Sequence, residues 1–130
     1  MTGSLADVTL IVITLNEEDN IGSCLGSASG VGQIIVVDSF SSDRTVEIAK
    51  EAGAEVYRRE FISNAEQKNW AMNKATGSWI LILDADERLS PALKEEISGE
   101  LKNPGAEGYW IHRRNKFMNR YIRHCGWNRD

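Results

Sequence analysis

Residues 79–86 read Trp79-Ile-Leu-Ile-Leu-Asp-Ala-Asp86, five apolar residues followed at once by two acids that flank an alanine. An unbroken apolar run of this length is typical of a strand buried on both faces of a parallel sheet, because a strand with one solvated face alternates. Similar runs occur at Leu10-Ile-Val-Ile13 and Ile34-Ile-Val-Val37, and shorter ones at Val56-Tyr57 and Gly108-Tyr-Trp-Ile-His112. These runs predict a mainly parallel sheet.

Helices are expected in the intervals after the first two strands. Asn16 can cap a helix that covers Glu17 to about Ala28, and the acids in its first turn would be favoured by the helix dipole. Asp43 can cap a second helix, and Gly53 can end it.

Two further helices are expected in the second half of the chain. Ser63 and Glu66 have the spacing of a capping box, and Gly77 closes the helix that they begin. Ser90-Pro91 opens the fourth helix. The alternation of strands and helices predicts right-handed crossovers and an open α/β sheet with helices on both faces, formed by one domain over residues 1–130.

Composition excludes several protein classes. The chain has 130 residues, of which 42% are hydrophobic and 26% charged, which argues against disorder and coiled coil. Its apolar runs are far shorter than the ~20 residues of a membrane span. The chain start lacks the layout of a signal peptide, and Cys24 and Cys125 lie too far apart for a zinc motif. We therefore expect a reduced, cytoplasmic location.

The charge of the chain is divided unevenly along its length. Residues 1–111 hold 9 Lys/Arg against 18 Asp/Glu, whereas residues 112–130 hold 6 against 1 and both histidines. This basic end could face an anionic partner, or its charges could simply be solvated, and both interpretations stay open. The candidate residues for an anionic partner or acceptor are Arg113, Arg114, Lys116, Arg120 and Arg123.

Polar residues follow each of the three long apolar runs. The first leads into Thr14-Leu-Asn-Glu17, the second into Asp38, and the third into Asp84 and Asp86. In open α/β sheets ligands bind beyond the carboxyl ends of the strands, so these acids are expected to meet at one edge. The alternative to a ligand site is that Asp38 and Asp84 only cap turns. A turn needs one such acid, so capping does not explain why Asp84 and Asp86 occur together. The sequence favours a site for Mg²⁺ or Mn²⁺, which prefer oxygen ligands.

Other chemistry is less well supported. The hydroxyl-rich loop from Ser39 to Thr45 could bond ribose or phosphate, or could be a turn that leads into a helix. A P-loop and a nucleophile elbow are both missing from the sequence, and Cys24 is expected to be a small core residue. A receiver-type signalling domain would need a lysine after a later strand, and Lys116 is the nearest one.

Four stretches of this chain form a set of motifs in a defined order. They are Ile11-Val-Ile-Thr-Leu-Asn-Glu-Glu18, Ile35-Val-Val-Asp38-Ser with Ser42-Asp-Arg-Thr45, Gln67-Lys-Asn69, and Gly77-Ser-Trp-Ile-Leu-Ile-Leu-Asp-Ala-Asp86. In order and spacing they resemble the family 2 glycosyltransferases of the GT-A fold. Residues 108–127 further resemble the lipopolysaccharide core β-glucosyltransferase branch of that family.

The resemblance implies a nucleotide-sugar donor, commonly UDP-linked, and a role for each matching residue. Asp38 would bond the uracil ring, Asp84 would lie near the ribose, and Asp86 would bind the metal that bridges the diphosphate. Lys68 stands at a basic position that is usually Arg in the family. The lysine offers a single point charge where the arginine would offer two parallel hydrogen-bond donors. The implied donor-binding set is Thr14, Leu15, Asn16, Glu17, Asp38, Lys68, Asp84, Ala85 and Asp86, with Asp84 and Asp86 toward the metal.

The resemblance also implies an activity and partners. We expect inverting transfer of a sugar, with glucose as the expected sugar, from a UDP-sugar to a lipopolysaccharide-core or other cell-envelope glycan. Lipid-linked acceptors and peripheral contact with the inner membrane are expected, and nucleic acid is not. Family members are roughly twice this long by domain arithmetic, so the chain looks like a truncated donor-binding half whose general base lies beyond Asp130. The alternative is a catalytically inactive nucleotide-sugar-binding module.

Overall fold

The computed structural model describes residues 3–103, 108–112 and 119–124, the last two segments as backbone only. Its helices are η1 (Leu5–Asp7), α1 (Ile21–Ser27), α2 (Thr45–Glu51), α3 (Asn64–Met72) and α4 (Pro91–Lys102). Its strands are β1 (Val8–Thr14), β2 (Gln33–Asp38), β3 (Glu55–Arg58), β4 (Trp79–Asp84), β5 (Gly108–His112) and β6 (Asn119–His124).

The strands form one sheet in the order β3-β2-β1-β4-β6-β5. The first four are parallel to one another, whereas β6 runs antiparallel to β4 and β5 antiparallel to β6. The prediction of a mainly parallel, open α/β sheet is therefore confirmed. Strand β6 was not predicted, and its antiparallel pairing with β5 adds an antiparallel part to one edge of the sheet.

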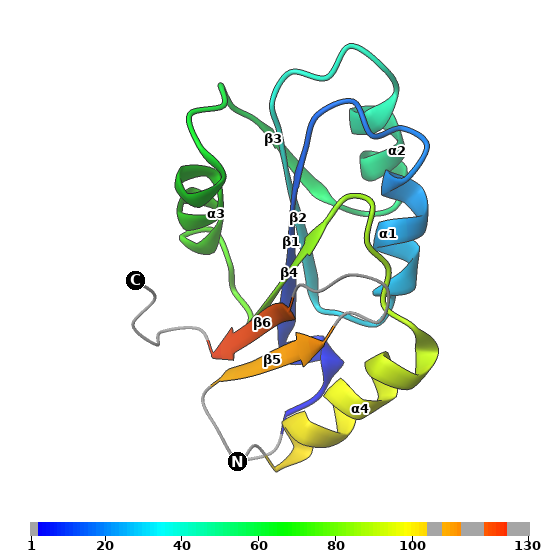
Figure 1. Ribbon diagram of the computed structural model, residues 1–130, viewed down its shortest axis with the longest axis vertical. Coiled ribbons are helices and arrows are strands. Elements are labelled where there is room, and N and C mark those ends of the chain that lie inside the picture. Colours follow the sequence, from blue (N-terminus) through cyan, green and yellow to red (C-terminus); the bar gives the residue numbers. More distant parts are fainter. Residues whose placement is uncertain (1–2, 104–107, 113–118, 125–130) are drawn as a thin grey trace.

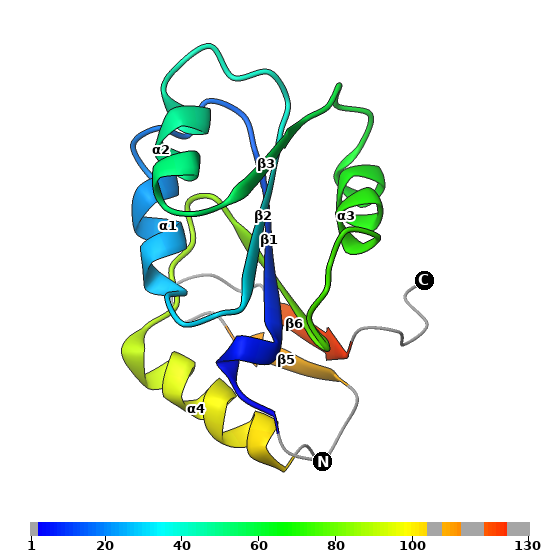
Figure 2. The same cartoon turned by 180° about the vertical axis from the view of Figure 1, so that it is seen from behind.

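Helices cover both faces of the sheet, as predicted (Figures 1 and 2). The helices α1 and α2 lie on one face and α3 on the opposite face. Alternate residues of β1 divide between the two layers: Leu10 and Val12 belong to the core cluster that includes residues of α1, α2 and α4, and Ile11 belongs to the cluster with α3. Both faces of the central strands are thus apolar, which is why their sequence shows no alternation.

The first helix begins later than predicted. Its first residue is Ile21, and Glu17, Glu18 and Asp19 lie in the loop before it rather than in its first turn. The prediction that Asn16 caps this helix is wrong. Asn16 adopts a left-handed conformation with φ 52°, and its side-chain oxygen accepts a hydrogen bond from the Ser42 N–H of the neighbouring loop.

The second helix was predicted nearly correctly. It begins at Thr45 with Arg44 in the capping position, one residue after the predicted cap Asp43. The Asp43 carboxylate nevertheless accepts the Thr45 N–H at 2.9 Å, so it satisfies one of the unpaired donors of the first turn. The helix ends at Glu51, and Gly53 follows in the left-handed region with φ 89°.

The third helix is shorter than predicted. Ser63 caps it by accepting the Glu66 N–H at 3.1 Å, but the Glu66 carboxylate pairs with Arg59 instead of completing the box. It ends at Met72, well before Gly77. Gly77 is needed for another reason, since a Cβ there would lie 2.6 Å from the Asp7 carbonyl oxygen.

The fourth helix follows the prediction. Ser90 accepts the Leu93 N–H at 3.1 Å, and Pro91 is the first helical residue. Ile97 and Leu101 are buried on its inner side, in the same core cluster as α1.

Candidate nucleotide-sugar site

The ends of the three long parallel strands meet at one edge of the sheet. Because β1 lies between β2 and β4, Thr14 stands opposite Asp38 on one side, and Ile13 stands opposite Asp84 on the other. Neighbouring strands are about 4.8 Å apart, so these chain positions are close although they are distant in sequence. The predicted convergence of the strand ends is confirmed.

Asp38 is fully buried at the end of β2. Its carboxylate accepts hydrogen bonds from the N–H and the hydroxyl of Ser41, at 2.8 and 2.5 Å, and lies 3.9 Å from Nε of Arg58. Its carbonyl oxygen accepts the Arg59 N–H at 2.9 Å. Asp38 therefore has the turn-forming role that was the alternative to ligand binding. Each of its carboxylate oxygens can still accept one more hydrogen bond.

Thr14 occupies the end of β1 beside Asp38. Its side chain is only 4% exposed, and Oγ1 has no hydrogen-bond partner among the residues that the structure describes. Its carbonyl oxygen is satisfied by the Ser39 N–H at 3.0 Å. A buried hydroxyl that is left unpaired is costly and is uncommon in folded proteins, so this atom has the capacity for a bond that the described fold does not supply.

Two hydroxyl groups join the loop after β1 to the loop after β2. Ser41 accepts the Asn16 N–H at 2.7 Å and donates to Asp38. Thr45 accepts the Glu17 N–H at 2.8 Å and donates to Asp43 at 2.5 Å. These bonds support the turn interpretation for both hydroxyls and fix the backbone of Asn16 and Glu17.

The outer part of the same two loops is held by acids. Glu18 accepts the Arg44 N–H at 2.9 Å, and its own N–H donates to Asp43 at 3.2 Å. Desolvation of the Asp43 carboxyl opposes ionisation, but hydrogen bonds from Thr45 and from the Glu18 N–H outweigh it and lower the pKa of Asp43.

The turn after β4 places its side chains alternately inside and outside. Asp84 is half-buried, Ala85 is buried in the core and Asp86 is exposed. The buried Glu87 accepts the Asp84 N–H at 2.6 Å and returns its own N–H to the Asp84 carbonyl at 2.9 Å. Glu87 thus closes the turn that presents the Asp84 and Asp86 pair, a role that the sequence did not reveal.

Cys24 confirms its prediction as a core residue. It is fully buried on α1, and its thiol donates to the Asp84 carbonyl at 3.5 Å. Burial, with a smaller contribution from the nearby acids Glu87 and Asp86, raises the pKa of this thiol to about 12. Such a thiol stays protonated at neutral pH and is a poor nucleophile.

The acids can supply only part of a metal site. Within the described ranges no group of three or more His, Cys, Asp or Glu residues is arranged to hold an ion. Mg²⁺ and similar ions are commonly held by one or two carboxylates together with substrate phosphates. Two carboxylates at the end of β4, one of them exposed, fit that donor set.

A buried amide on α3 also reaches the site. Gln67 is fully buried, and its Nε2 donates to Ser39 Oγ at 3.2 Å, while its Oε1 accepts Nη1 of Arg59 at 2.7 Å. Arg59 also forms a double hydrogen bond with Glu66 and lies 4.5 Å from the centre of the Trp70 ring. Gln67 is the first residue of the Gln67-Lys-Asn69 motif, in which the family resemblance implies a role for Lys68 only. Lys68 follows it on α3 and is half-buried.

The family model for glycosyl transferase family 2 matches residues 9–128. The chain belongs to this family. An uncharacterized glycosyltransferase of Rickettsia typhi is 38% identical over 91 residues, which cover 69% of this chain and 31% of that protein. The lipopolysaccharide core biosynthesis glycosyltransferase LpsC of Rhizobium meliloti is 33% identical over 93 residues, 68% of this chain and 34% of LpsC. The chain thus spans about a third of the length of these relatives.

The fold agrees with that assignment. Glucosyl-3-phosphoglycerate synthase from Mycobacterium tuberculosis, in a complex with Mn²⁺, UDP and glucosyl-3-phosphoglycerate, superposes with a TM-score of 0.73 at 20% identity. The match covers 90% of this chain and 56% of the synthase. The family 2 chain therefore has the GT-A fold that its motifs predicted.

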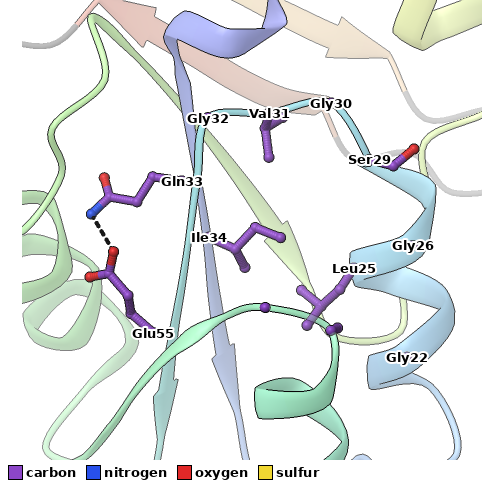
Figure 3. A pocket seen from close by; sticks show the side chains of 12 residues that line it. Gly22, Leu25, Gly26, Ser29, Gly30, Val31, Gly32, Gln33, Ile34 and Glu55 are labelled. Atoms are coloured by element: carbon purple, nitrogen blue, oxygen red, sulfur yellow. Dashed lines mark hydrogen bonds between the residues drawn. The ribbon is translucent and has the colours of Figure 1, made fainter.

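The cavity drawn in Figure 3 lies elsewhere in this glycosyltransferase family member. Its volume is about 540 Å³, and it lies where β2 begins, between α1 and the turn that follows α2. Its lining includes Leu25, Ile34 and five glycines, and Glu55 at its border is bonded to Gln33. The predicted donor-binding residues do not line it.

The basic end is only partly within the described structure. Arg113, Arg114 and Lys116 lie outside the described residues, and Arg120 and Arg123 belong to β6, of which only the backbone is described. In the part of the chain that the structure covers, helices are too short or too polar to cross a bilayer.

Proposed function

We propose that this chain binds a nucleotide sugar, UDP-linked, together with Mg²⁺ or Mn²⁺ at the carboxyl ends of β2, β1 and β4. The observation that carries the proposal is the buried Thr14 hydroxyl, which has no partner among the described residues and belongs to the residue opposite Asp38 at the edge where α/β folds bind ligands. A nucleobase offers donors and acceptors to both groups. Leu15, which is 53% exposed, adds an apolar surface next to them.

The order of the strands separates two parts of the donor. The nucleoside would lie over β1 and β2, and the diphosphate would lie toward Asp84 and Asp86 at the end of β4. The two carboxylates would repel a diphosphate by themselves, so the cation and the donor are expected to bind together. The bound cation would act as a Lewis acid toward the negative charge that develops on the leaving diphosphate.

We assign the remaining residues positioning roles. Glu87 holds the turn that carries Asp84 and Asp86, and the Ser41 and Thr45 hydroxyls hold Asn16 and Glu17 against the loop after β2. Lys68 is proposed to contact the nucleotide as a single positive charge. These contacts would give the donor a preformed site, which lowers the entropy cost of binding.

We propose inverting transfer of glucose to a lipopolysaccharide-core or other cell-envelope acceptor, and the name of the relative LpsC supports that class of acceptor. The general base that deprotonates the acceptor hydroxyl is proposed to lie beyond Asp130. The five basic residues from Arg113 to Arg123 would hold anionic groups of a lipid-linked acceptor at the cytoplasmic face of the inner membrane, without a role for nucleic acid.

A second candidate is a nucleotide-sugar-binding module without catalysis. Both candidates predict donor binding by these 130 residues, and they differ in whether the longer protein transfers the sugar.

The test is a calorimetric titration of the chain with UDP, UDP-glucose and GDP, with and without Mn²⁺ or Mg²⁺. We expect saturable binding of the uridine compounds that is at least tenfold stronger with the cation. A ligand at 100 times its Kd should stabilise the fold by about 2.7 kcal/mol, which thermal unfolding can check. If neither uridine compound binds in the presence of either ion, the proposed function is wrong.

A further inference from the structure

Phe40, in the loop after β2, has an unusual conformation. Its φ is 62°, in the left-handed region that bulky side chains rarely occupy. The other described non-glycine residue with positive φ is Asn16, whose short polar side chain tolerates that region. The Phe40 side chain is 59% exposed, so burial of the ring does little to offset the strain.

The two neighbours of Phe40 explain how the strain is maintained. Ser39 donates its N–H to the Thr14 carbonyl and accepts from the buried Gln67 amide. Ser41 is bonded to Asp38 and to the Asn16 N–H. With the chain anchored on both sides, the residue between them must turn outward. A glycine would satisfy this backbone at lower cost, so the fold does not account for an aromatic ring here.

Exposed apolar side chains gather at the same end of the molecule. Among the described residues, the large hydrophobic side chains that are exposed are Leu15, Phe40, Phe61 and Ile62. All four lie in the loops that follow β1, β2 and β3, which are neighbours in the sheet (Figure 1). Leu15 and Phe40 come one and two residues after the opposed pair Thr14 and Asp38.

Position and charge indicate what the ring contacts. Phe40 follows β2, which is two strands from β4, so it lies about 10 Å from the Asp84 and Asp86 turn and on the nucleoside side of the proposed site. The flat apolar face of a nucleobase suits an exposed aromatic ring. The nearby acids Glu17, Glu18 and Asp43 disfavour the anionic lipid surface that could otherwise cover these side chains.

We propose that Phe40 is a nucleobase-contacting residue, held in a strained conformation by Ser39 and Ser41 so that its ring faces the base of the bound donor. This assignment rests on the proposed function, since it needs a nucleotide at the edge of β1 and β2. It adds a contact to the residues that the family motifs imply.

The test compares Phe40→Gly, Phe40→Tyr and the control Phe61→Ala, which removes an exposed ring from the next loop. Calorimetry with Mn²⁺ measures UDP, and pyrophosphate serves as a probe that lacks the base. We expect Phe40→Gly to lower the affinity for UDP tenfold or more and the affinity for pyrophosphate less than twofold. Phe40→Tyr and Phe61→Ala should stay within about threefold of the parent chain for both ligands.

Thermal unfolding without ligand separates this role from a structural one. Because glycine relieves the strain at φ 62°, the midpoint of Phe40→Gly should equal or exceed that of the parent chain. The inference is overturned if Phe40→Gly keeps the parent affinity for UDP, or if its affinities for UDP and pyrophosphate fall equally and its unfolding midpoint also falls. Binding to phosphatidylglycerol vesicles is measured as well, and a variant that loses only vesicle binding would also overturn it. Failure of the parent chain to bind UDP would instead overturn the proposed function.

Discussion

At the amino-terminal end of the parallel sheet the turns are held by close backbone packing and by hydrogen bonds among Thr9, Gln33 and Thr76, whereas at the carboxyl-terminal end polar side chains bridge neighbouring loops. Gly32 and Gly77 precede β2 and β4 in positions where any side chain would overlap the backbone of Ala6 or Asp7. At the other end, Ser41 and Thr45 bridge two loops, the buried Thr14 hydroxyl has no partner among the described residues, and Phe40 is strained.

The two ends of the sheet also differ in whether their contacts contribute to stability alone or also to ligand binding. At the amino-terminal end, which borders the cavity of Figure 3, the Thr9 and Gln33 side chains are hydrogen-bonded to each other and to the backbone of Gly77 and Thr76. At the carboxyl-terminal end the Thr14 hydroxyl, which lacks a partner in the described fold, and the strained loop at Phe40 cost stability locally, and the proposed donor site would use both. Substitutions at the first end should therefore change stability, and substitutions at the second can change ligand affinity as well as stability.

Gly32→Ala should be the most destabilising change. The new Cβ would overlap the Ala6 carbonyl, and rigid backbone can relieve this only by moving η1 away from the sheet. We expect a loss of about 3 kcal/mol in the free energy of unfolding, measured by urea denaturation. The matched control is Gly26→Ala on α1, where a Cβ meets nothing within 4 Å and helix propensity predicts a gain of about 0.5–1 kcal/mol. Equal stability of the two variants would contradict the packing argument.

Gln67→Met should affect both stability and binding. It removes a fully buried amide and leaves Ser39 and Arg59 each without one hydrogen bond, which should cost about 2 kcal/mol in urea denaturation. UDP affinity should also fall, because Ser39 anchors the loop after Asp38. Gln67→Glu is the control: the Ser39 hydroxyl can then donate to the new carboxylate, so UDP affinity should recover. If UDP affinity in Gln67→Met stays at the parent value, α3 has no part in the site.

Asp86→Ala should leave the fold intact and weaken binding of the donor. Since Asp86 is exposed, the unfolding midpoint should change little. Affinity for UDP in the presence of Mn²⁺ should fall about tenfold, which is about 1.4 kcal/mol. Affinity without the ion should be unaffected. An unchanged affinity with Mn²⁺ would remove the metal from the donor site and would favour the non-catalytic module.

The smallest effect is expected from Asp43. Its pKa is lowered in the folded state, so the stabilisation that it gives is present above the unfolded pKa of about 3.9 and is lost as pH falls below it. Asp43→Asn should be slightly less stable than the parent chain at pH 6, and the difference should shrink toward pH 3. Thermal unfolding across this range measures it. A difference that does not vary with pH would mean that the Asp43 charge has no role in joining the loops.

The central strands β1, β2 and β4 could be predicted because each one is marked by a short, continuous apolar run in the sequence. Runs such as Ile34 to Val37 are apolar on both faces, and the strands they predict are present. Helix starts were less predictable where distant residues compete. Asn16 is a good capping residue by type, but its oxygen is taken by Ser42 of another loop, so the helix begins at Ile21. Ser90, which has no such competitor, caps its helix as predicted.

The candidate site could be predicted at the level of strand ends and not at the level of contacts. Asp38 and Asp84 follow their strands in the sequence, and their convergence follows from parallel pairing. The Ser41 and Thr45 bridges and the Gln67 contact with Ser39 join residues 25 to 28 positions apart, and residue type alone does not specify such partners. The unpaired Thr14 hydroxyl is likewise a property of the folded chain.

The strand β6 has a consequence for how this domain could be divided. It pairs with β4 through Trp79, Ile80 and Leu81, and it supplies the partner that β4 would otherwise lack on the side away from β1. A shorter chain that ended at residue 103 would turn the most apolar strand of the sheet into an open edge, and exposed edges of that kind recruit strands from other molecules. Strand β6 therefore covers the edge of β4 through which a shortened chain would be expected to associate with other copies.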